Sequence, residues 1–252
     1  PIVSFFESVF AATMKITDWI MVFAAPGVFA LTASAVSSFG SGIFATISKY
    51  LMVLMIGFIL QMFVVYPIFL RCFSKVSAIM LFSAVAEAIM VAFGTASSSA
   101  TLPLTIACCE KRGISHKISS FVLPLGATLN FDGTALLQTV AVIFLAQAYQ
   151  VPLTPFLVVE IAILAIIASS TCAGIPGGGL ITIALILNGM GLSPEQLVAG
   201  FAFLFTIERL TDMLRTTLNV ISDAVVAATI ADNENEINYD LLNNPAAYEE
   251  IA

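Results

Sequence analysis

The sequence predicts an all-α polytopic membrane protein, and composition and long apolar runs are the first evidence for this fold class. Of the 252 residues, 60% are hydrophobic and only 10% are charged. The mean hydropathy is +1.04, far from the balance of soluble proteins. The stretch from Leu51 to Leu70 has no charged residue and is long enough to cross a hydrocarbon core. Much of the net charge of −7 lies in residues 232–250, so it does not indicate a partner, and nucleic acid is not expected.

A polar stripe near the C-terminus is the second piece of evidence. It consists of Glu208, Asp212, Arg215, Asn219 and Asp223, at steps of four, three, four and four residues. At about 100° per residue these side chains share roughly 80° of one helix face with apolar flanks. Ionisable residues are costly inside a membrane and usually face a partner, a cavity or a transport path. Because the stripe carries both signs of charge and an amide, it suits a zwitterion together with a cation, which predicts a solute carrier.

Six hydrophobic blocks give the order of the helices. They run at about 13–36, 47–73, 77–109, 118–149, 151–187 and 194–231. Blocks one, two and six predict whole helices, whereas small, polar and glycine-rich runs interrupt block three at 94–100 and block five at 169–179. Each interruption leaves roughly 15 residues on either side, too few to span but enough for one limb of a re-entrant hairpin. Backbone that leaves a helix at membrane depth must be buried in protein or line a wet cavity.

The order of the blocks predicts an inverted repeat. Each hairpin precedes a helix with a polar centre, at residues 130–134 in block four and at the stripe in block six. A hairpin makes no net crossing and the following helix makes one, so the second pair is upside down relative to the first. The predicted architecture is therefore a repeated unit of a re-entrant helical hairpin plus a broken transmembrane helix, which is typical of secondary transporters.

Basic residues predict which edge faces the cytoplasm. Those that flank the first hairpin and the start of block four are Arg71, Lys75, Lys111, Arg112 and Lys117. The positive-inside rule places this edge in the cytoplasm, with Lys49 as the exception. The four cysteines have no metal-ligand spacing and are interpreted as small apolar side chains. Because the chain begins with Pro1, we expect a processed, engineered or partial sequence.

Four motifs resemble those of the dicarboxylate/amino acid:cation symporters, the glutamate and aspartate transporters and their bacterial relatives. They are SSSATLP at 97–103, NFDGT at 130–134, AGIPGGG at 173–179, and DMLRT at 212–216 followed by Asn219 and Asp223. The resemblance covers nearly the whole chain, from the family's fifth transmembrane helix to its C-terminus. It implies two transmembrane helices in 1–75, a transport core in 76–232 and an acidic cytoplasmic tail in 233–252. It also implies transport rather than catalysis, a place in the cell membrane (the inner membrane in bacteria), and a homotrimer when the family's N-terminal scaffold helices are present.

The resemblance implies roles for the polar residues. Arg215 resembles the arginine that pairs with the side-chain carboxylate of an acidic amino acid, which suits a bidentate guanidinium. The alternative is a structural pair with Asp212 at i, i+3; in the family Asp212 takes the substrate ammonium. For Glu208 two roles stay open, to support the binding residues from behind or to line the pore. The serines of the first hairpin can also cap the two half-helices of that hairpin. The implied substrate-binding residues are Ser98, Thr134, Ile175, Gly179, Asp212, Arg215, Thr216 and Asn219.

Cation binding is implied at oxygen ligands, which a hard ion requires. One sodium site is implied at Gly126, Asn130, Asn219 and Asp223, and a second at Thr128, Ser169, Ser170 and Cys172. Asp132 with Asn130 belongs to a third site, whose other ligands come from a helix outside this chain. No cofactor is expected besides a co-transported cation.

Departures from the family pattern concern the driving ion. Phe131 replaces the usual Met, which puts tight sodium coupling in question. Ala96 and Met213 occupy positions where members often have a second arginine, so potassium counter-transport is not assumed. Gln138 stands where animal members carry a protonatable Glu, which argues against that proton route and favours sodium over the proton as the driving ion.

The favoured function is secondary active symport of glutamate or aspartate with cations, by an elevator-type alternating-access mechanism. The alternatives are a transport-inactive fragment that lacks the N-terminal scaffold helices and a proton-coupled C4-dicarboxylate carrier. An intramembrane aspartyl protease is disfavoured because Asp132 and Asp223 lack a Gly-x-Gly-Asp context.

Overall fold

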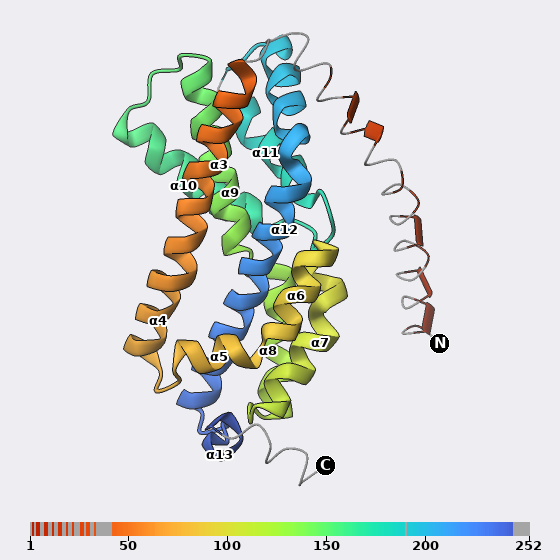
Figure 1. The fold of residues 1–252 in the computed structure, drawn as a ribbon, viewed down its shortest axis with the longest axis vertical. Coiled ribbons are helices and arrows are strands. Elements are labelled where there is room, and N and C mark those ends of the chain that lie inside the picture. The colour runs from red at the N-terminus through yellow and green to blue at the C-terminus, as the bar shows by residue number, and fades with distance from the viewer. Residues whose placement is uncertain are drawn as a thin grey trace.

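The described part of the chain is mostly helical. The computed structural model describes residues 42–189 and 191–243, together with single positions between 2 and 33; apart from those positions, block one lies outside the described residues. The elements are α3 (Gly42–Leu60), η1 (Gln61–Val65), α4 (Tyr66–Phe73), α5 (Ala78–Ala84), α6 (Ala86–Thr95), α7 (Ser98–Lys111), α8 (His116–Leu129), α9 (Asp132–Ala148), α10 (Pro155–Ser170), α11 (Gly178–Asn188), α12 (Pro194–Asn233) and α13 (Tyr239–Asn243). The all-α prediction is confirmed for these ranges, which contain no named strand (Figure 1).

Block two forms one long helix with a widened turn. Residues of α3, η1 and α4 follow without a break, and Ala45–Phe73 is long and apolar enough to cross a membrane. The π-turn η1 is marked by the amide of Tyr66, which donates to the carbonyl of Gln61 five residues before it. Pro67 lacks an N–H and crowds the carbonyl four residues earlier, which a wider turn relieves.

Block three has more breaks than the sequence predicted. Its first limb is a bent pair, with a 61° angle between α5 and α6, a bend that we did not predict. After α6, Ala96 adopts a left-handed conformation (φ 53°), and the Ser97 hydroxyl then caps α7 by accepting from the amide of Ala100. We call residues 95–99 tip 1; it turns the chain back as the predicted hairpin requires.

Block four is broken at its polar centre, and block five forms a second hairpin. Asn130 and Phe131 leave helical geometry between α8 and α9, yet His116–Ala148 as a whole is apolar and long enough to cross a membrane.

In block five the chain leaves α10, turns through residues 171–177, which we call tip 2, and enters α11. Gly177 has φ 80° there, a conformation that favours glycine. α10 and α11 are apolar helices of 16 and 11 residues, as limbs of a re-entrant hairpin require.

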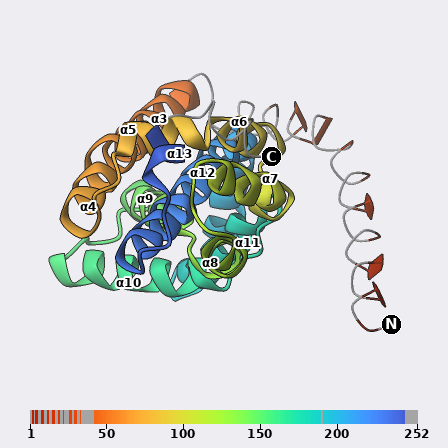
Figure 2. The same ribbon diagram turned by 90° about the horizontal axis from the view of Figure 1, so that it is seen from below.

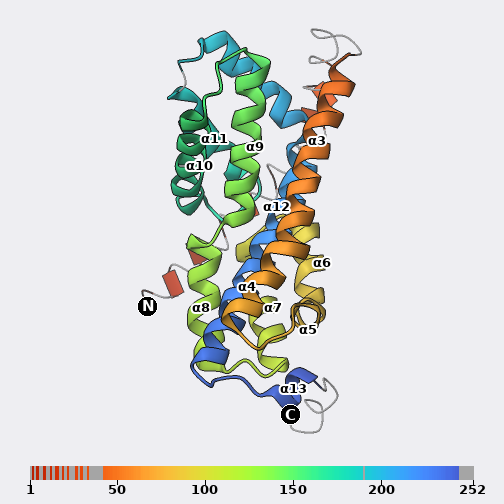
Figure 3. The ribbon, with the colours of Figure 1, turned by 90° about the vertical axis from the view of Figure 1, so that its left-hand side faces the viewer.

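Block six is the central helix, α12, which begins with a capping box between Ser193 and Gln196 and has Pro194 at its first turn. It runs unbroken through the polar stripe and lies among the other helices in the view along the long axis (Figure 2). Figure 3 shows the α6–α7 hairpin in one half of the molecule and the α10–α11 hairpin in the other. This arrangement agrees with the predicted layout, while the inverted relation between the halves stays a prediction.

The segment after α12 folds back on one end of the molecule. The backbone of Ile237 pairs with that of Ile114 in the α7–α8 turn, and the Glu236 carboxylate accepts from Lys117 Nζ at 2.7 Å. Asp232 accepts from the Ser74 hydroxyl and from the backbone amide of Lys75. The basic residues predicted to be cytoplasmic flank these same connections, so they gather at one end.

Candidate functional site

The centre of the polar stripe is a fully buried ion pair. Arg215 and Asp212 have 1% and 2% of their surface exposed. The Arg215 guanidinium donates through Nε and Nη2 to Asp212 Oδ1, and through Nη1 to the Thr134 hydroxyl at 2.9 Å. Thr134, at the start of α9, also accepts from the amide nitrogen of Asn219 at 3.1 Å. The broken centre of block four therefore lies against the stripe.

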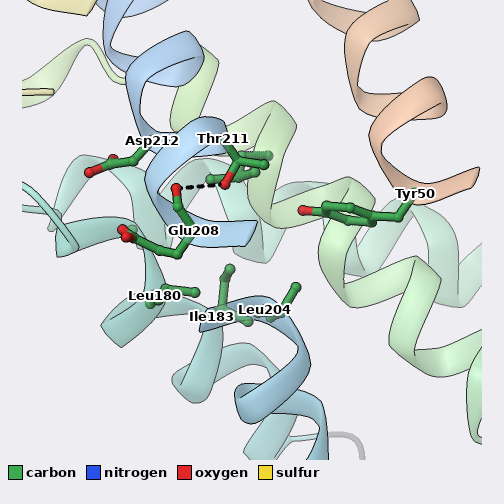
Figure 4. Close-up of a pocket in the computed structure, with 9 residues that line it drawn as sticks. Tyr50, Leu180, Ile183, Leu204, Glu208, Thr211 and Asp212 are labelled. Carbon is green, nitrogen blue, oxygen red and sulfur yellow. Dashed lines mark hydrogen bonds between the residues drawn. The ribbon is translucent and has the colours of Figure 1, made fainter. Parts of the chain in front are cut away.

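Tip 2 closes directly over this pair. The backbone amide of Gly177 donates to Asp212 Oδ2 at 3.0 Å, and a Cβ on Gly179 would lie 3.7 Å from Arg215. The neighbouring cavity, lined in part by Tyr50, Leu180 and Glu208, measures about 10 Å³, which is the room one water needs. In Figure 4 the carboxyl groups of Glu208 and Asp212 lie on the side of α12 away from Tyr50. The ion pair is therefore closed to any ligand larger than a water molecule in this structure.

The two tips touch each other beside the stripe. The carbonyl of Gly174 in tip 2 accepts from the Ser97 hydroxyl at 2.8 Å and from the Ser99 amide at 3.3 Å. Ser98, a predicted substrate ligand, is 3% exposed between these two residues. The predicted ligand Ile175 is half-buried in tip 2, and its carbonyl accepts from the amide of Gly178. The Ser97 hydroxyl thus caps α7 and also connects tip 1 to tip 2.

Two predicted ligands on the stripe have buried oxygens without partners. Thr216 Oγ1 and Asn219 Oδ1 are fully enclosed and have no hydrogen-bond partner among the described residues. Such orphaned buried oxygens are rare because they lose hydration without compensation. They lie within one helical turn of Arg215 and on the same buried side, so the stripe offers a donor and unused acceptors to a ligand. This is the chemistry of a polar binding site.

The oxygens of the first predicted sodium site are brought together. Asn130 Nδ2 donates to Asp223 Oδ1 at 2.9 Å, and both residues face the end of α8. A Cβ on Gly126 would lie 2.5 Å from Asp223 Oδ1, so only glycine lets this helix approach the carboxylate. Asn219, on the same helix as Asp223, has an unused side-chain oxygen, so these residues can offer a carboxylate and amide oxygens. These hard oxygens fit an alkali cation.

The second predicted sodium site is less assembled. The hydroxyls of Thr128, Ser169 and Ser170 each donate to a carbonyl of their own helix. Thr128 is exposed, while Cys172 is buried at the start of tip 2. The ends of α8 and tip 2 nevertheless meet, since a Cβ on Gly174 would lie 3.3 Å from the Ala127 carbonyl. Its role as a cation site stays a prediction.

Asp132 has two partners that the sequence did not reveal. The Tyr66 hydroxyl donates to Asp132 Oδ2 at 2.6 Å, and Gln61 Nε2 donates to the same oxygen at 3.1 Å. Both residues flank the π-turn η1, a type of distortion that is common at functional sites. The only hint in the sequence was that Gln61 interrupts the apolar run from Leu51 to Leu70. Both partners are hydrogen-bond donors to Asp132, and the third cation site stays a prediction.

Two of the departures from the family pattern, Phe131 and Gln138, are buried. Phe131 is 2% exposed at the break between α8 and α9. Gln138 is fully buried, donates to the Thr182 hydroxyl on α11, and leaves its Oε1 without a partner among the described residues. Thr182 in turn donates to the Gly179 carbonyl. Gln138 therefore ties α9 to the second hairpin.

Comparison with known proteins agrees with this geometry. The profile of the sodium:dicarboxylate symporter family matches residues 1–233. A Caenorhabditis elegans protein, glt-4, named as a candidate sodium-dependent excitatory amino acid transporter, is 36% identical over 91% of this chain and 46% of its own length. The neutral amino acid transporters B(0) of Oryctolagus cuniculus and Homo sapiens are 36% and 34% identical, over 91% of this chain and 42% of theirs.

These relatives are named as transporters, not enzymes, and the chain spans less than half of their length. The profile match covers the broken helices, both tips and the polar stripe of α12. The chain belongs to the sodium:dicarboxylate symporter family.

Proposed function

We propose that this chain is the transport core of a secondary active symporter that moves glutamate or aspartate together with sodium. The observation that carries the proposal is the buried Arg215–Asp212 pair, bonded to Thr134 and covered by tip 2. A buried charge is retained in a membrane protein at considerable cost, which function explains better than stability does.

An acidic amino acid can replace this internal ion pair and keep both Asp212 and Arg215 paired, while its α-carboxylate would lie at the backbone of Ser98 in tip 1. Its ammonium group would take Asp212 and its side-chain carboxylate would take Arg215, so one buried pair becomes two. Thr216 and Asn219, whose oxygens lack partners, would receive the remaining donors of the substrate. A neutral amino acid would leave Arg215 without a carboxylate when Asp212 turns to the ammonium. The guanidinium therefore favours an acidic substrate over the neutral substrates named for some relatives.

Sodium is the proposed driving ion because of the oxygens around Asp223. A carboxylate at membrane depth needs a counter-charge; Asn130 lies against Asp223, and Asn219, one turn earlier on α12, has an unused side-chain oxygen. Asn219 also bonds Thr134, which holds Arg215. A cation at Asp223 and a substrate at Arg215 would thus share one residue, which gives coupling a physical path.

Movement in the proposed cycle begins at tip 2. The cavity beside the ion pair has a volume of only about 10 Å³. Entry of substrate therefore requires breaking the hydrogen bond from the Gly177 amide to Asp212. For translocation we propose an elevator-type motion of this hairpin core against scaffold helices outside the chain, in a homotrimer of the cell membrane.

The test is substrate binding and uptake by the full-length gene product in liposomes. We expect aspartate and glutamate to accumulate with an inward sodium gradient, and Arg215→Ala to abolish this while sparing the sodium response of stability. Lys117→Ala, which changes a cation at the cytoplasmic edge, is the matched control and should keep uptake. Accumulation that follows a pH gradient and ignores sodium would favour the proton-coupled C4-dicarboxylate carrier. Binding without any accumulation would favour a transport-inactive protein.

A further inference from the structure

A second arginine on α12 lies beside the substrate site, and the function proposed above does not use it. Arg209 follows Glu208 directly, six residues before Arg215 on the same helix. Its Nη2 donates to the carbonyl of Gly94 at 3.1 Å, across 115 positions of the sequence. Gly94 lies in the last turn of α6, just before tip 1. Arg209 therefore joins α12 to the first hairpin.

The bond explains how a charged residue is held at this place. The last carbonyls of a helix have no amide partner and carry the negative end of its dipole, so a guanidinium is a favourable partner. The attachment point precedes tip 1, whose Ser97 and Ser99 both bond to Gly174 of tip 2. Arg209 thus fixes the first hairpin at the end that touches the second.

A formal charge count gives Arg209 a second role. The charged residues in the middle of α12 are Glu208, Arg209, Asp212 and Arg215. They lie within about two turns of one helix, so the four form one cluster with two formal negative and two formal positive charges. Without Arg209 the cluster would carry one net negative charge and would repel a substrate that is itself an anion.

We propose that Arg209 is a specificity-determining residue: it neutralises the acidic side of the cluster so that an anionic amino acid is accepted, and it positions tip 1 through Gly94. This inference rests on the proposed function. A unit charge about 10 Å from a ligand, at an effective dielectric of about 20, changes a binding constant by roughly tenfold or slightly more. The charge effect should fall on anionic substrates alone, whereas loss of the bond to Gly94 should weaken anionic and neutral substrates alike.

Aspartate and asparagine provide the test because they have nearly the same shape and differ by one charge. The dissociation constants of both would be measured at fixed sodium for the full-length protein, wild type, Arg209→Gln, Arg209→Lys and the control Arg112→Gln. The last variant removes the same charge at the end of α7, at the cytoplasmic edge. We expect Arg209→Gln to lower the preference for aspartate over asparagine about tenfold, with Arg209→Lys and Arg112→Gln close to wild type.

The outcomes separate charge from structure. Equal weakening of both ligands in Arg209→Gln, or the same loss in Arg209→Lys, would overturn the charge role. An unchanged preference in Arg209→Gln would overturn the inference and leave the proposed function standing. A wild-type protein with no preference for aspartate would overturn both. If Arg209→Gln does not fold, the double variant Arg209→Met, Glu208→Gln is measured in its place. This variant keeps the cluster neutral, so its preference for aspartate over asparagine must match that of the wild type.

Discussion

The buried pair of Arg215 and Asp212 makes a quantitative prediction about stability. Arg215→Met removes the guanidinium and leaves Asp212 as a buried carboxylate whose remaining described hydrogen bond is from the Gly177 amide. Asp212→Asn combined with Arg215→Met removes both charges and keeps an oxygen for Gly177. The single and double variants therefore differ by one buried, uncompensated charge.

The magnitude follows from the burial of both partners. Breaking a buried ion pair by removing one member costs about 3–5 kcal/mol, whereas replacing both members by neutral side chains is often nearly neutral. Arg215 and Asp212 are 1% and 2% exposed, so solvent screens neither. We expect Arg215→Met to lower the free energy of unfolding by about 3 kcal/mol or more, and the double variant to recover at least about 2 kcal/mol of that loss.

The cysteines supply the assay. Cys108 and Cys109 are buried, Cys72 is exposed and Cys172 lies in tip 2, so in a Cys72→Ser, Cys172→Ser background a fluorogenic maleimide reports unfolding. Denaturant titrations in detergent micelles would give the free energies, with Arg112→Met as the control for loss of an arginine at the edge of the protein. Strictly additive losses in the double variant would refute the reasoning, because they would mean that the two charges do not compensate each other.

Three further predictions concern the cation ligands and the cytoplasmic end. Asp223→Asn should abolish the response of aspartate affinity to sodium, a response of roughly 5- to 150-fold in the wild type; titrations in sodium and choline buffers measure it, and an intact sodium response would contradict the assignment. Tyr66→Phe should destabilise the protein by about 1–3 kcal/mol, because half-buried Asp132 loses a charge-assisted hydrogen bond from buried Tyr66. The maleimide assay measures this, and Tyr239→Phe at the edge is the comparison. Lys117 lowers the pKa of Glu236 by donating a hydrogen bond to it. This bond should therefore stabilise the packing of residues 234–243 on the α7–α8 turn above pH 4.5, and the stabilisation should be lost as the pH falls further. Hydrogen exchange at the amide of Leu242 would measure this, and Lys117→Met should reduce the pH dependence.

The sequence predicted the helices and the stripe because both depend on local rules. Apolar runs, caps such as Ser193 and the spacing of Asp212, Arg215 and Asn219 need only helix periodicity and the cost of charge in a membrane. The break at Asn130 was visible for the same reason. The family and the all-α membrane fold therefore followed from the sequence.

Contacts between distant segments could not be predicted in the same way. Asp132 is held by Tyr66 and Gln61, and nothing in the sequence around them shows which helix lies opposite. The chain bends by 61° between α5 and α6, at Val85. Neither helix has a proline or glycine near this position, so no local signal in the sequence predicts the bend. The pairing of Arg215 with Asp212 was considered only as the alternative to substrate binding, and the described structure contains it.

The shared carbonyl of Gly174 links the evolution of the two tips. It accepts from Ser97 and Ser99 together, and a Cβ on Gly174 would approach the Ser99 hydroxyl to 2.7 Å. Lengthening or shortening tip 2 by one residue would displace this carbonyl and deprive two donors on the other hairpin of their acceptor. A change in the length of one tip therefore requires a compensating change in the other. When one tip is replaced by that of a relative, the other tip should be replaced as well.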